Sequence, residues 1–287
     1  MRSPVAGGTE DVVAPADPGG ETDWNRAWQV ARELAGRRGD SEAWNRRAPS
    51  FARNASKSGY VERMLELMSP DPSWSVLDVG CGSGTLAVPL ARRVRSVTAL
   101  DFSPRMLELL GERCGAEGLT NVVPVLGSWE DDWARLGIGR CDVALASRSL
   151  SVNDLREALL KLDRAARHKV FVTAPVGEGP IDGRVFEAAG RHRVPGPDYV
   201  FPLNLLRQLG IEPRLEFIPV AEGRRFATLE DALERVLWMI SDPSPAEVGR
   251  LRAWLERELV SVAGGFELAS PRTVRWAVLS WEKRRAG

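Results

Sequence analysis

Two carboxylates and three glycines stand at positions where they could build a site for a positively charged ligand. Asp78 precedes a turn in which every second residue is glycine: Gly80, Gly82 and Gly84. A second acid, Asp101, follows 21 residues after Gly80. Glycine lets a ligand pack against bare backbone, and a carboxylate attracts a cation but repels a pyrophosphate. The spacing therefore favours a cationic ligand held close to the backbone.

The element that must position Asp78 is predicted to be a buried strand. Residues 75–79 read Ser-Val-Leu-Asp-Val, a mostly apolar run typical of a strand covered on both faces. The strand should enter the glycine turn and then a helix over residues 85–91, whose first N–H groups would face the ligand. Thr85 stands where the dinucleotide pattern G-x-G-x-x-G needs its last glycine. Together with Asp78, this disfavours a nicotinamide-dependent dehydrogenase.

A second strand, over residues 95–101, would place Asp101 at its end. The 21-residue offset from Gly80 fits the distance at which an acid meets ribose hydroxyls in a βαβ unit. Ser103 is expected to cap the following helix, which has Pro104 at its first position. We therefore expect Asp101 to bind a ribose.

The two segments resemble the first two motifs of the class I S-adenosylmethionine-dependent methyltransferases. Residues 76–84 are similar to the first motif, and residues 101–107, an acid followed by Ser and then Met-Leu, are similar to the second. The resemblance covers roughly residues 74–175. It implies an α/β fold with a Rossmann-like, seven-stranded, mostly parallel sheet and helices on both faces. It also implies methyl-transfer activity with S-adenosylmethionine as the cofactor.

The resemblance assigns roles to single residues. Asp78, Gly80 and Gly82 would line the methionine and ribose part of the cofactor, and Phe102 would pack near the adenine. The family usually has an acid beside the adenine amine, but Ser128 stands at that place, so recognition would pass to Ser128, to Trp129 or to backbone. The expected cofactor-binding residues are Asp78, Gly80, Cys81, Gly82, Ser83, Gly84, Asp101, Phe102, Ser103, Met106, Ser128, Trp129, Ala146 and Ser147.

The methyl acceptor is expected near the carboxyl ends of the first and fourth strands. The fourth strand ends in Ala-Ser-Arg-Ser at 146–149, where families that methylate adenine or a glutamine amide usually show Asn/Asp-Pro-Pro-aromatic. This disfavours amide and exocyclic-amine acceptors. We expect Arg148, Tyr60 and Tyr199 to bind the substrate, although Arg148 could instead form a structural ion pair.

No residue is identified as a general base, which methyl transfer does not always need. The candidates are Asp182 and His192, in a loop-rich insert at 177–198, and Tyr199 just beyond it. A structural or exposed role explains each of them more simply. Trp44 and Arg47 could help to close the pocket from the N-terminal side, although aromatic residues at helical spacing more often belong to a core.

Composition excludes several other classes. The chain has 39 basic and 39 acidic residues, so no basic field indicates nucleic-acid binding. Its three cysteines are widely spaced without a C-x-x-C, and it has only two histidines, so neither disulfides nor a metal site are expected. No apolar run is long enough to span a membrane, and no signal core is present. We expect a cytoplasmic protein.

The chain is expected to form one domain with additions. Residues 1–21 should be a disordered tail, and residues 22–287 should form the methyltransferase domain. Within that domain we expect N-terminal helices at 22–70, a cofactor-binding core at 74–175, an insert at 177–198 and a helical insertion at 226–264. The last of these could pack on the sheet, cover the substrate as a lid or form a homodimer face.

The sequence thus predicts a methyltransferase that acts on a small molecule. Methylation of RNA or protein is an alternative, although the absence of a basic stripe argues against RNA. A cofactor-binding module without catalysis is another, because intact glycines and Asp101 argue for binding and not for turnover.

Overall fold

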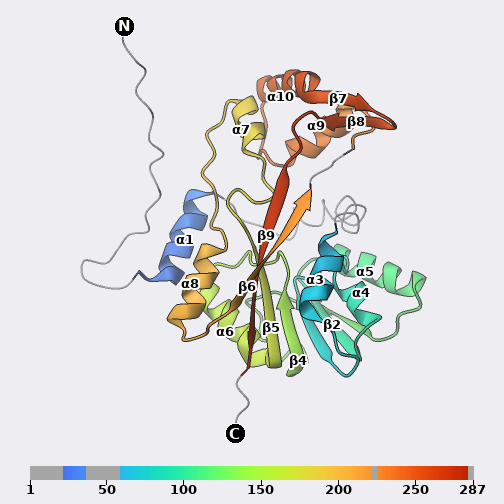
Figure 1. Ribbon diagram of the computed structural model, residues 1–287, viewed down its shortest axis with the longest axis vertical. Coiled ribbons are helices and arrows are strands. Elements are labelled where there is room, and N and C mark those ends of the chain that lie inside the picture. The colour runs from blue at the N-terminus through green and yellow to red at the C-terminus, as the bar shows by residue number, and fades with distance from the viewer. Residues whose placement is uncertain (1–21, 37–58, 222–224, 284–287) are drawn as a thin grey trace.

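The computed structural model describes residues 22–36, 59–221 and 225–283. At the centre of this described part is a seven-stranded sheet with the order β3-β2-β1-β4-β5-β9-β6 (Figure 1). Strands β1 to β5 run parallel, whereas β9 is antiparallel to both β5 and β6. The predicted fold class is confirmed. The strands of this sheet are β1 (Ser75–Val79), β2 (Ser96–Asp101), β3 (Val122–Leu126), β4 (Cys141–Ala146), β5 (Ala166–Pro175), β6 (Arg214–Ala221) and β9 (Thr273–Glu282).

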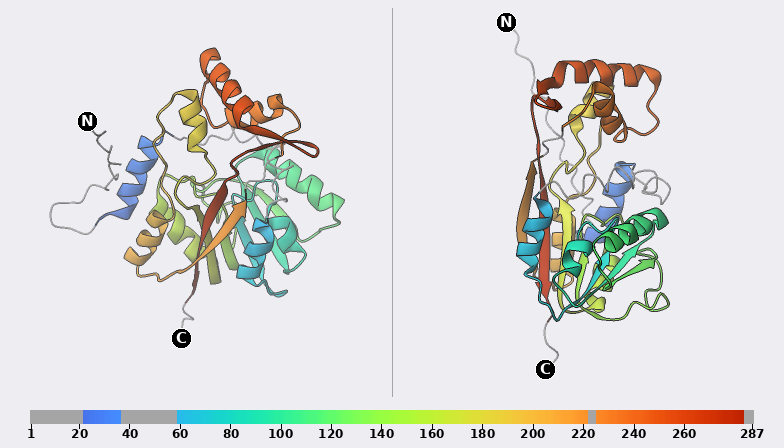
Figure 2. Two further views of the ribbon diagram at one scale, coloured as in Figure 1. Left: turned by 45° about the horizontal axis from the view of Figure 1, so that its top comes forward. Right: turned by 90° about the vertical axis from the view of Figure 1, so that its right-hand side faces the viewer.

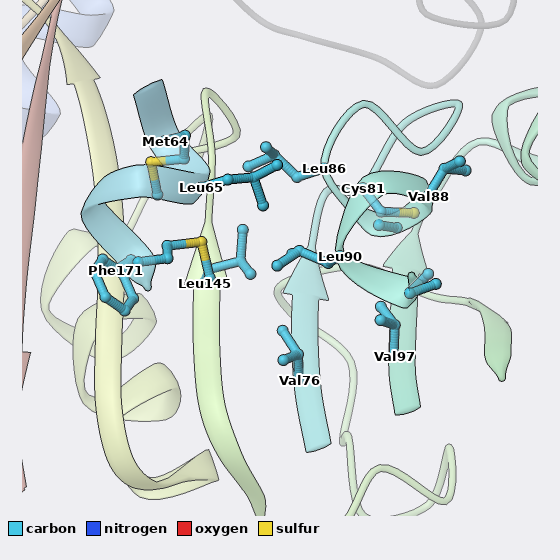
Figure 3. Close-up of a cluster of buried hydrophobic side chains, with 14 of the residues drawn as sticks. Met64, Leu65, Val76, Cys81, Leu86, Val88, Leu90, Val97, Leu145 and Phe171 are labelled. Carbon is cyan, nitrogen blue, oxygen red and sulfur yellow. The ribbon is translucent and has the colours of Figure 1, made fainter. Parts of the chain in front are cut away.

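Helices cover both faces of the sheet. They are α1 (Trp24–Leu34), α3 (Tyr60–Met68), α4 (Ala87–Ala91), α5 (Pro104–Ala116), α6 (Leu155–Ala165) and α8 (Val200–Gln208). One face buries α3, α4 and α5, and Figure 3 shows Met64 and Leu65 of α3 in one cluster with Phe171 and Leu145 of the sheet. The other face buries α1, α6 and α8. Successive residues of a strand pack on opposite faces: Val76 lies in the cluster with α3, α4 and α5, and Leu77 in the cluster with α1, α6 and α8. Because both faces are buried, these strands are continuous apolar runs.

The rest of the described chain forms a small unit that we call the cap. It comprises α7 (Gly183–Ala189), α9 (Leu229–Leu237), α10 (Pro245–Glu258), β7 (Leu259–Val262) and β8 (Gly265–Leu268). The end of β6 pairs with the start of β9 at Ala221 and Thr273, and Trp276 of β9 pairs with Pro175 at the end of β5. The cap therefore stands beyond the carboxyl ends of the parallel strands (Figures 1 and 2).

The cap differs from the predicted helical insertion at 226–264. Its helices do not pack on the sheet: α9 and α10 share an apolar core with α7, so the insert at 177–198 joins the same unit. The helix α10 begins with the predicted capping box at Ser244 but ends at Glu258, and a β-hairpin follows it. Ala263 and Gly264 form the hairpin turn, because Val262 pairs with Gly265, and Gly264 has a φ of 86°.

Gly84→Ala is expected to destabilise the protein by about 2–4 kcal/mol, the sum of a left-handed backbone and an overpacked side chain. Gly84 has a φ of 81°, and a Cβ there would lie 2.5 Å from Leu110 Cδ1 and 2.9 Å from Val88 Cγ2. Gly118→Ala is the matched control, because its φ is 66° but no atom lies within 4 Å of the added Cβ. Urea unfolding of both variants measures the difference. Equal losses would show that crowding by Leu110 contributes nothing.

Candidate functional site

The glycine turn is tied to the neighbouring strand and leaves no room for a side chain at its start. The N–H groups of Gly80 and Cys81 donate to the carbonyl of Leu100 at 2.8 and 3.0 Å. Gly80 has a φ of 71°, and a Cβ there would lie 2.4 Å from Ser149 Cβ. Glycine is therefore required where the turn meets the loop after β4.

The turn presents backbone to the outside and side chains to the core. Gly80 and Gly82 are partly exposed, whereas Cys81 is buried in the cluster that Figure 3 shows. Gly84 is buried as well, against Leu110. Several predicted cofactor-binding side chains therefore do not line the surface of this site, because they pack inward: Cys81, Ser83, Ser103, Met106 and Ala146.

Asp101 is fixed by the turn on one side and by the next helix on the other. Its Oδ2 accepts the N–H of Gly82 at 2.8 Å, and its Oδ1 accepts the N–H of Ser103 at 2.9 Å. Ser103 in turn caps α5, as predicted. Burial raises the pKa of Asp101, and the N–H groups of Ser103, Gly82 and Phe102 oppose this rise. A carboxylate has about four acceptor positions, so Asp101 can still accept a hydrogen bond from a hydroxyl group of a ligand.

Asp78 lies beneath the turn and acts through its charge. Only 2 % of the residue is exposed, and the N–H of Ala87 donates to it. Burial, and after it the charge of Asp101, raise the pKa of Asp78 to about 7, against weaker opposing effects of Ala87 and Arg148. A cation bound nearby would favour the charged form of both acids. Direct contact between Asp78 and a ligand is not supported, because its carboxylate is covered.

The loop after β3 contains an acid that the sequence analysis missed. Asp131 Oδ2 accepts the N–H of Ser128 at 2.7 Å and its hydroxyl at 3.0 Å. These bonds lower the pKa of Asp131. The spacing Ser-x-x-Asp, at which turn side chains bond to each other, could have indicated this pair. Phe102, which follows the neighbouring strand β2, is apolar but 36 % exposed.

The loop after β4 is anchored by α3 and β5. The hydroxyl of Tyr60 lies 2.7 Å from Ser147 Oγ and donates to Thr173 Oγ1 at 3.2 Å. The N–H of Arg148 donates to the same Thr173 oxygen at 2.8 Å. The guanidinium carbon of Arg148 lies 4.3 Å from the centre of the Tyr60 ring and 5.7 Å from that of Trp276. The structure thus brings Tyr60, Ser147 and Arg148 together, as predicted.

The same loop is held from the other face of the sheet. Ser149 Oγ donates to the carbonyl of Val79 at 2.6 Å, and Trp129 Nε1 donates to the carbonyl of Ser149 at 3.1 Å. Trp28 of α1 donates through Nε1 to the carbonyl of Val152 at 2.9 Å. Since α1 packs beside α8 and α6, this helix does not cover the glycine turn but fixes the loop that lies next to it.

A family model described as a methyltransferase domain matches residues 76–169, which include the glycine turn, Asp101 and the end of β4. The chain belongs to the class I S-adenosylmethionine-dependent methyltransferases. It is therefore an enzyme that transfers methyl groups, and S-adenosylmethionine is its cofactor. The exposed backbone of Gly80 and Gly82, the remaining acceptor capacity of Asp101 and the exposed Phe102 fit this cofactor.

Similar proteins support the fold and leave the acceptor open. An uncharacterized protein of Haemophilus influenzae is 35% identical over 245 residues, which are 84% of this chain and 89% of that protein. The nocamycin O-methyltransferase of Saccharothrix syringae is 32% identical over 122 residues, 40% of this chain and 43% of that enzyme. A putative methyltransferase from Bacillus halodurans, 14% identical, superimposes with a TM-score of 0.54 over 78% of this chain and 99% of that structure. Other partial matches include a methyltransferase of ribosomal RNA.

One predicted substrate-binding residue, Tyr199, lies apart from Tyr60 and Arg148. The ring of Tyr199 packs against Phe217 at 5.5 Å. Phe217 pairs with Ala277, the neighbour of Trp276 in β9, so Phe217 and Tyr199 lie on the opposite face from Trp276. Tyr199 therefore does not meet Arg148, because successive residues of a strand face opposite sides.

The other candidates are not placed at the site either. Although burial alone would raise it, the pKa of Asp182 is lowered by the hydrogen bond from Arg184 and the charge of Arg272, so this acid is a poor base. Its carboxylate also caps α7. His192 is exposed in the cap segment. Trp44 and Arg47 lie outside the described residues. Within those residues, no helix of the methyltransferase has the length and apolar character needed to cross a bilayer.

Proposed function

We propose that this methyltransferase acts in the cytoplasm on a small molecule. The observation that carries the proposal is the pair Asp78 and Asp101, which lie at the carboxyl ends of adjacent strands and both have a raised pKa. In this proposal Asp101 accepts the ribose hydroxyls and the backbone of Gly80 and Gly82 packs against the cofactor. Their arrangement supports a bound nucleoside that carries positive charge.

The adenine end of the cofactor is assigned to the loop after β3. Phe102, which is exposed, would pack against the base. The carboxylate of Asp131, held by Ser128, would accept the adenine amine in the role that the family gives to an acid. Trp129 would act indirectly, because its indole N–H already holds the carbonyl of Ser149.

When bound, S-adenosylmethionine supplies a methyl group on a sulfonium, which an acceptor lone pair attacks in line. The chain contributes alignment, and the loop after β4 is suited to it because Tyr60, Thr173 and Val79 fix its three residues 147–149.

The small-molecule class is supported by charge and by the cap. A net charge of zero provides no field for a polyanion such as RNA. The cap stands beyond the carboxyl ends of the strands, the side on which the acceptor is expected (Figure 2). These features favour an acceptor that enters the site whole over a site on a large RNA or protein surface.

Calorimetric titration and a gel shift test this function together. We expect S-adenosylmethionine and its demethylated product to bind at one site per chain, while NAD gives no heat, because Thr85 replaces the last glycine of the dinucleotide pattern and Asp78 would repel a pyrophosphate. We expect no shift of RNA by the protein at physiological salt. Binding of NAD alone would refute the assigned site, and a clear RNA shift would refute the small-molecule class.

A further inference from the structure

Arg148 adopts a backbone conformation that a residue with a side chain rarely takes. Its φ is 59°, which costs about 1–2 kcal/mol for a residue other than glycine. Its N–H is held by Thr173 Oγ1 at 2.8 Å, at the end of the strand that neighbours β4. Strain that the surroundings enforce in this way is concentrated at functional sites. The strain fixes the direction in which the Arg148 side chain leaves the loop.

The guanidinium of Arg148 is also fixed. It lies over the rings of Tyr60 and Trp276, which are 0% and 8% exposed. Tyr60 cannot turn away, because its hydroxyl is bonded to Thr173 and lies against Ser147. Stacking on aromatic rings suits the planar, weakly hydrated guanidinium. A cation that is already ordered loses little entropy when a ligand binds to it.

The position of Arg148 points to the acceptor and not to the cofactor. Arg148 follows β4, and the rings beneath its guanidinium belong to Tyr60 of α3 and Trp276 of β9. Asp101 ends β2, which lies on the other side of β1 in the sheet. The charge of Arg148 still reaches Asp78 and lowers the pKa of that acid. Arg148 is partly exposed and directly follows the carboxyl end of β4. It therefore borders the site on the side away from the ribose.

We propose that Arg148 binds a carboxylate of the methyl acceptor, so that the substrates are small carboxylic acids. This inference rests on the proposed function, since it names the class of small molecule. A guanidinium forms two parallel hydrogen bonds with a carboxylate, and such a pair also orients the rest of the molecule. The carboxylate would set the distance between the acceptor atom and the methyl group.

Matched acids and amides test the proposal. Protein saturated with the demethylated cofactor is titrated, by ligand-observed NMR, with benzoate and benzamide and with phenylacetate and phenylacetamide. We expect the acids to bind at least about tenfold more tightly than the amides, the size of one charge-assisted pair. Arg148→Gln should abolish this preference, and Arg148→Lys, which keeps the charge and the stem over the rings, should retain part of it.

Arg167→Gln is the matched control, because Arg167 is a partly exposed arginine near the opposite end of β5, paired with Asp142. It should keep the full preference for acids, and all variants should bind the demethylated cofactor as the wild type does. Equal behaviour of acids and amides toward the wild type, including no binding of either, would overturn the proposal. So would a loss of cofactor affinity in Arg148→Gln with the acid preference intact, since Arg148 would then serve the cofactor's own carboxylate. Neither result depends on the RNA gel shift, which tests the small-molecule class itself.

Discussion

Asp101→Ala is expected to weaken binding of S-adenosylmethionine by at least about a hundredfold. A hydrogen bond from a ribose hydroxyl to a charged group contributes about 1.5–3 kcal/mol, and about 1.4 kcal/mol corresponds to tenfold in affinity. The variant also removes the acceptor that holds the N–H of Gly82, so the turn itself should loosen. Calorimetry of the variant and of the wild type measures the change.

Asp142→Ala provides the control for a general loss of structure. Asp142 is a largely buried strand acid that also accepts a backbone N–H, that of Ser75 at 2.7 Å, but it lies at the amino end of β4. Its replacement should lower stability and leave cofactor affinity unchanged. Asp101→Asn should fall between wild type and alanine, because its amide retains one acceptor oxygen. Unchanged affinity in a folded Asp101→Ala would remove Asp101 from the cofactor site.

The parts of the site that follow from local rules could be predicted from the sequence. The end of β2 at Asp101 follows from an apolar strand pattern that stops before Ser-Pro, and Ser103 caps the next helix in the structure. Gly80 and Gly84 have positive φ, as a turn built on glycine requires. The strand β4 ends at Ala146, as its apolar run predicts. In each case the signal lies within a few residues of the feature.

The parts that depend on packing could not be predicted. The side chain of Cys81 belongs to the same buried cluster as Leu90 of α4. This packing, and not the local sequence, decides that Cys81 faces the core and not the ligand. The role of Trp28 needs a contact across 124 residues, to the carbonyl of Val152. Tyr199 was expected to bind the substrate with Tyr60 and Arg148, but its ring packs on Phe217, whose face is set by the register of β6 on β9. Long-range pairing leaves no local pattern in a single sequence.

Asp78→Asn is expected to stabilise the cofactor-free protein at high pH and not at low pH. The pKa of Asp78 is about 7 in the fold, raised first by burial and then by Asp101, against a usual value of 3.8. Between these values the folded state holds a proton that the unfolded chain has lost, so stability falls as the pH rises through this window. A rise of this size corresponds to about 4 kcal/mol above pH 7 and to nothing below pH 4. Asparagine removes the penalty and keeps an acceptor for the N–H of Ala87.

Urea unfolding of wild type and Asp78→Asn from pH 4 to pH 8 measures this difference. The control is Asp142→Asn, which should lower the free energy of unfolding at high pH, whereas Asp78→Asn should raise it. Although burial alone would raise it, the hydrogen bonds from Ser75 lower the pKa of Asp142, so its charge stabilises the fold above the usual pKa and this contribution is lost as the pH falls. A constant difference between Asp78→Asn and wild type across the pH range would contradict the raised pKa.

The same titration should appear in cofactor recognition. S-adenosylmethionine carries a positively charged sulfonium, whereas its demethylated product carries a neutral thioether. The ratio of their affinities therefore reports the electrostatic potential at the sulfur. As Asp78 loses its proton near pH 7, the preference for the charged cofactor should grow by about tenfold, a modest Coulomb interaction in a protein interior. In Asp78→Asn the preference should stay flat with pH. A slope that survives this substitution would assign the field to Asp101, because that is the charge the structure places beside Asp78.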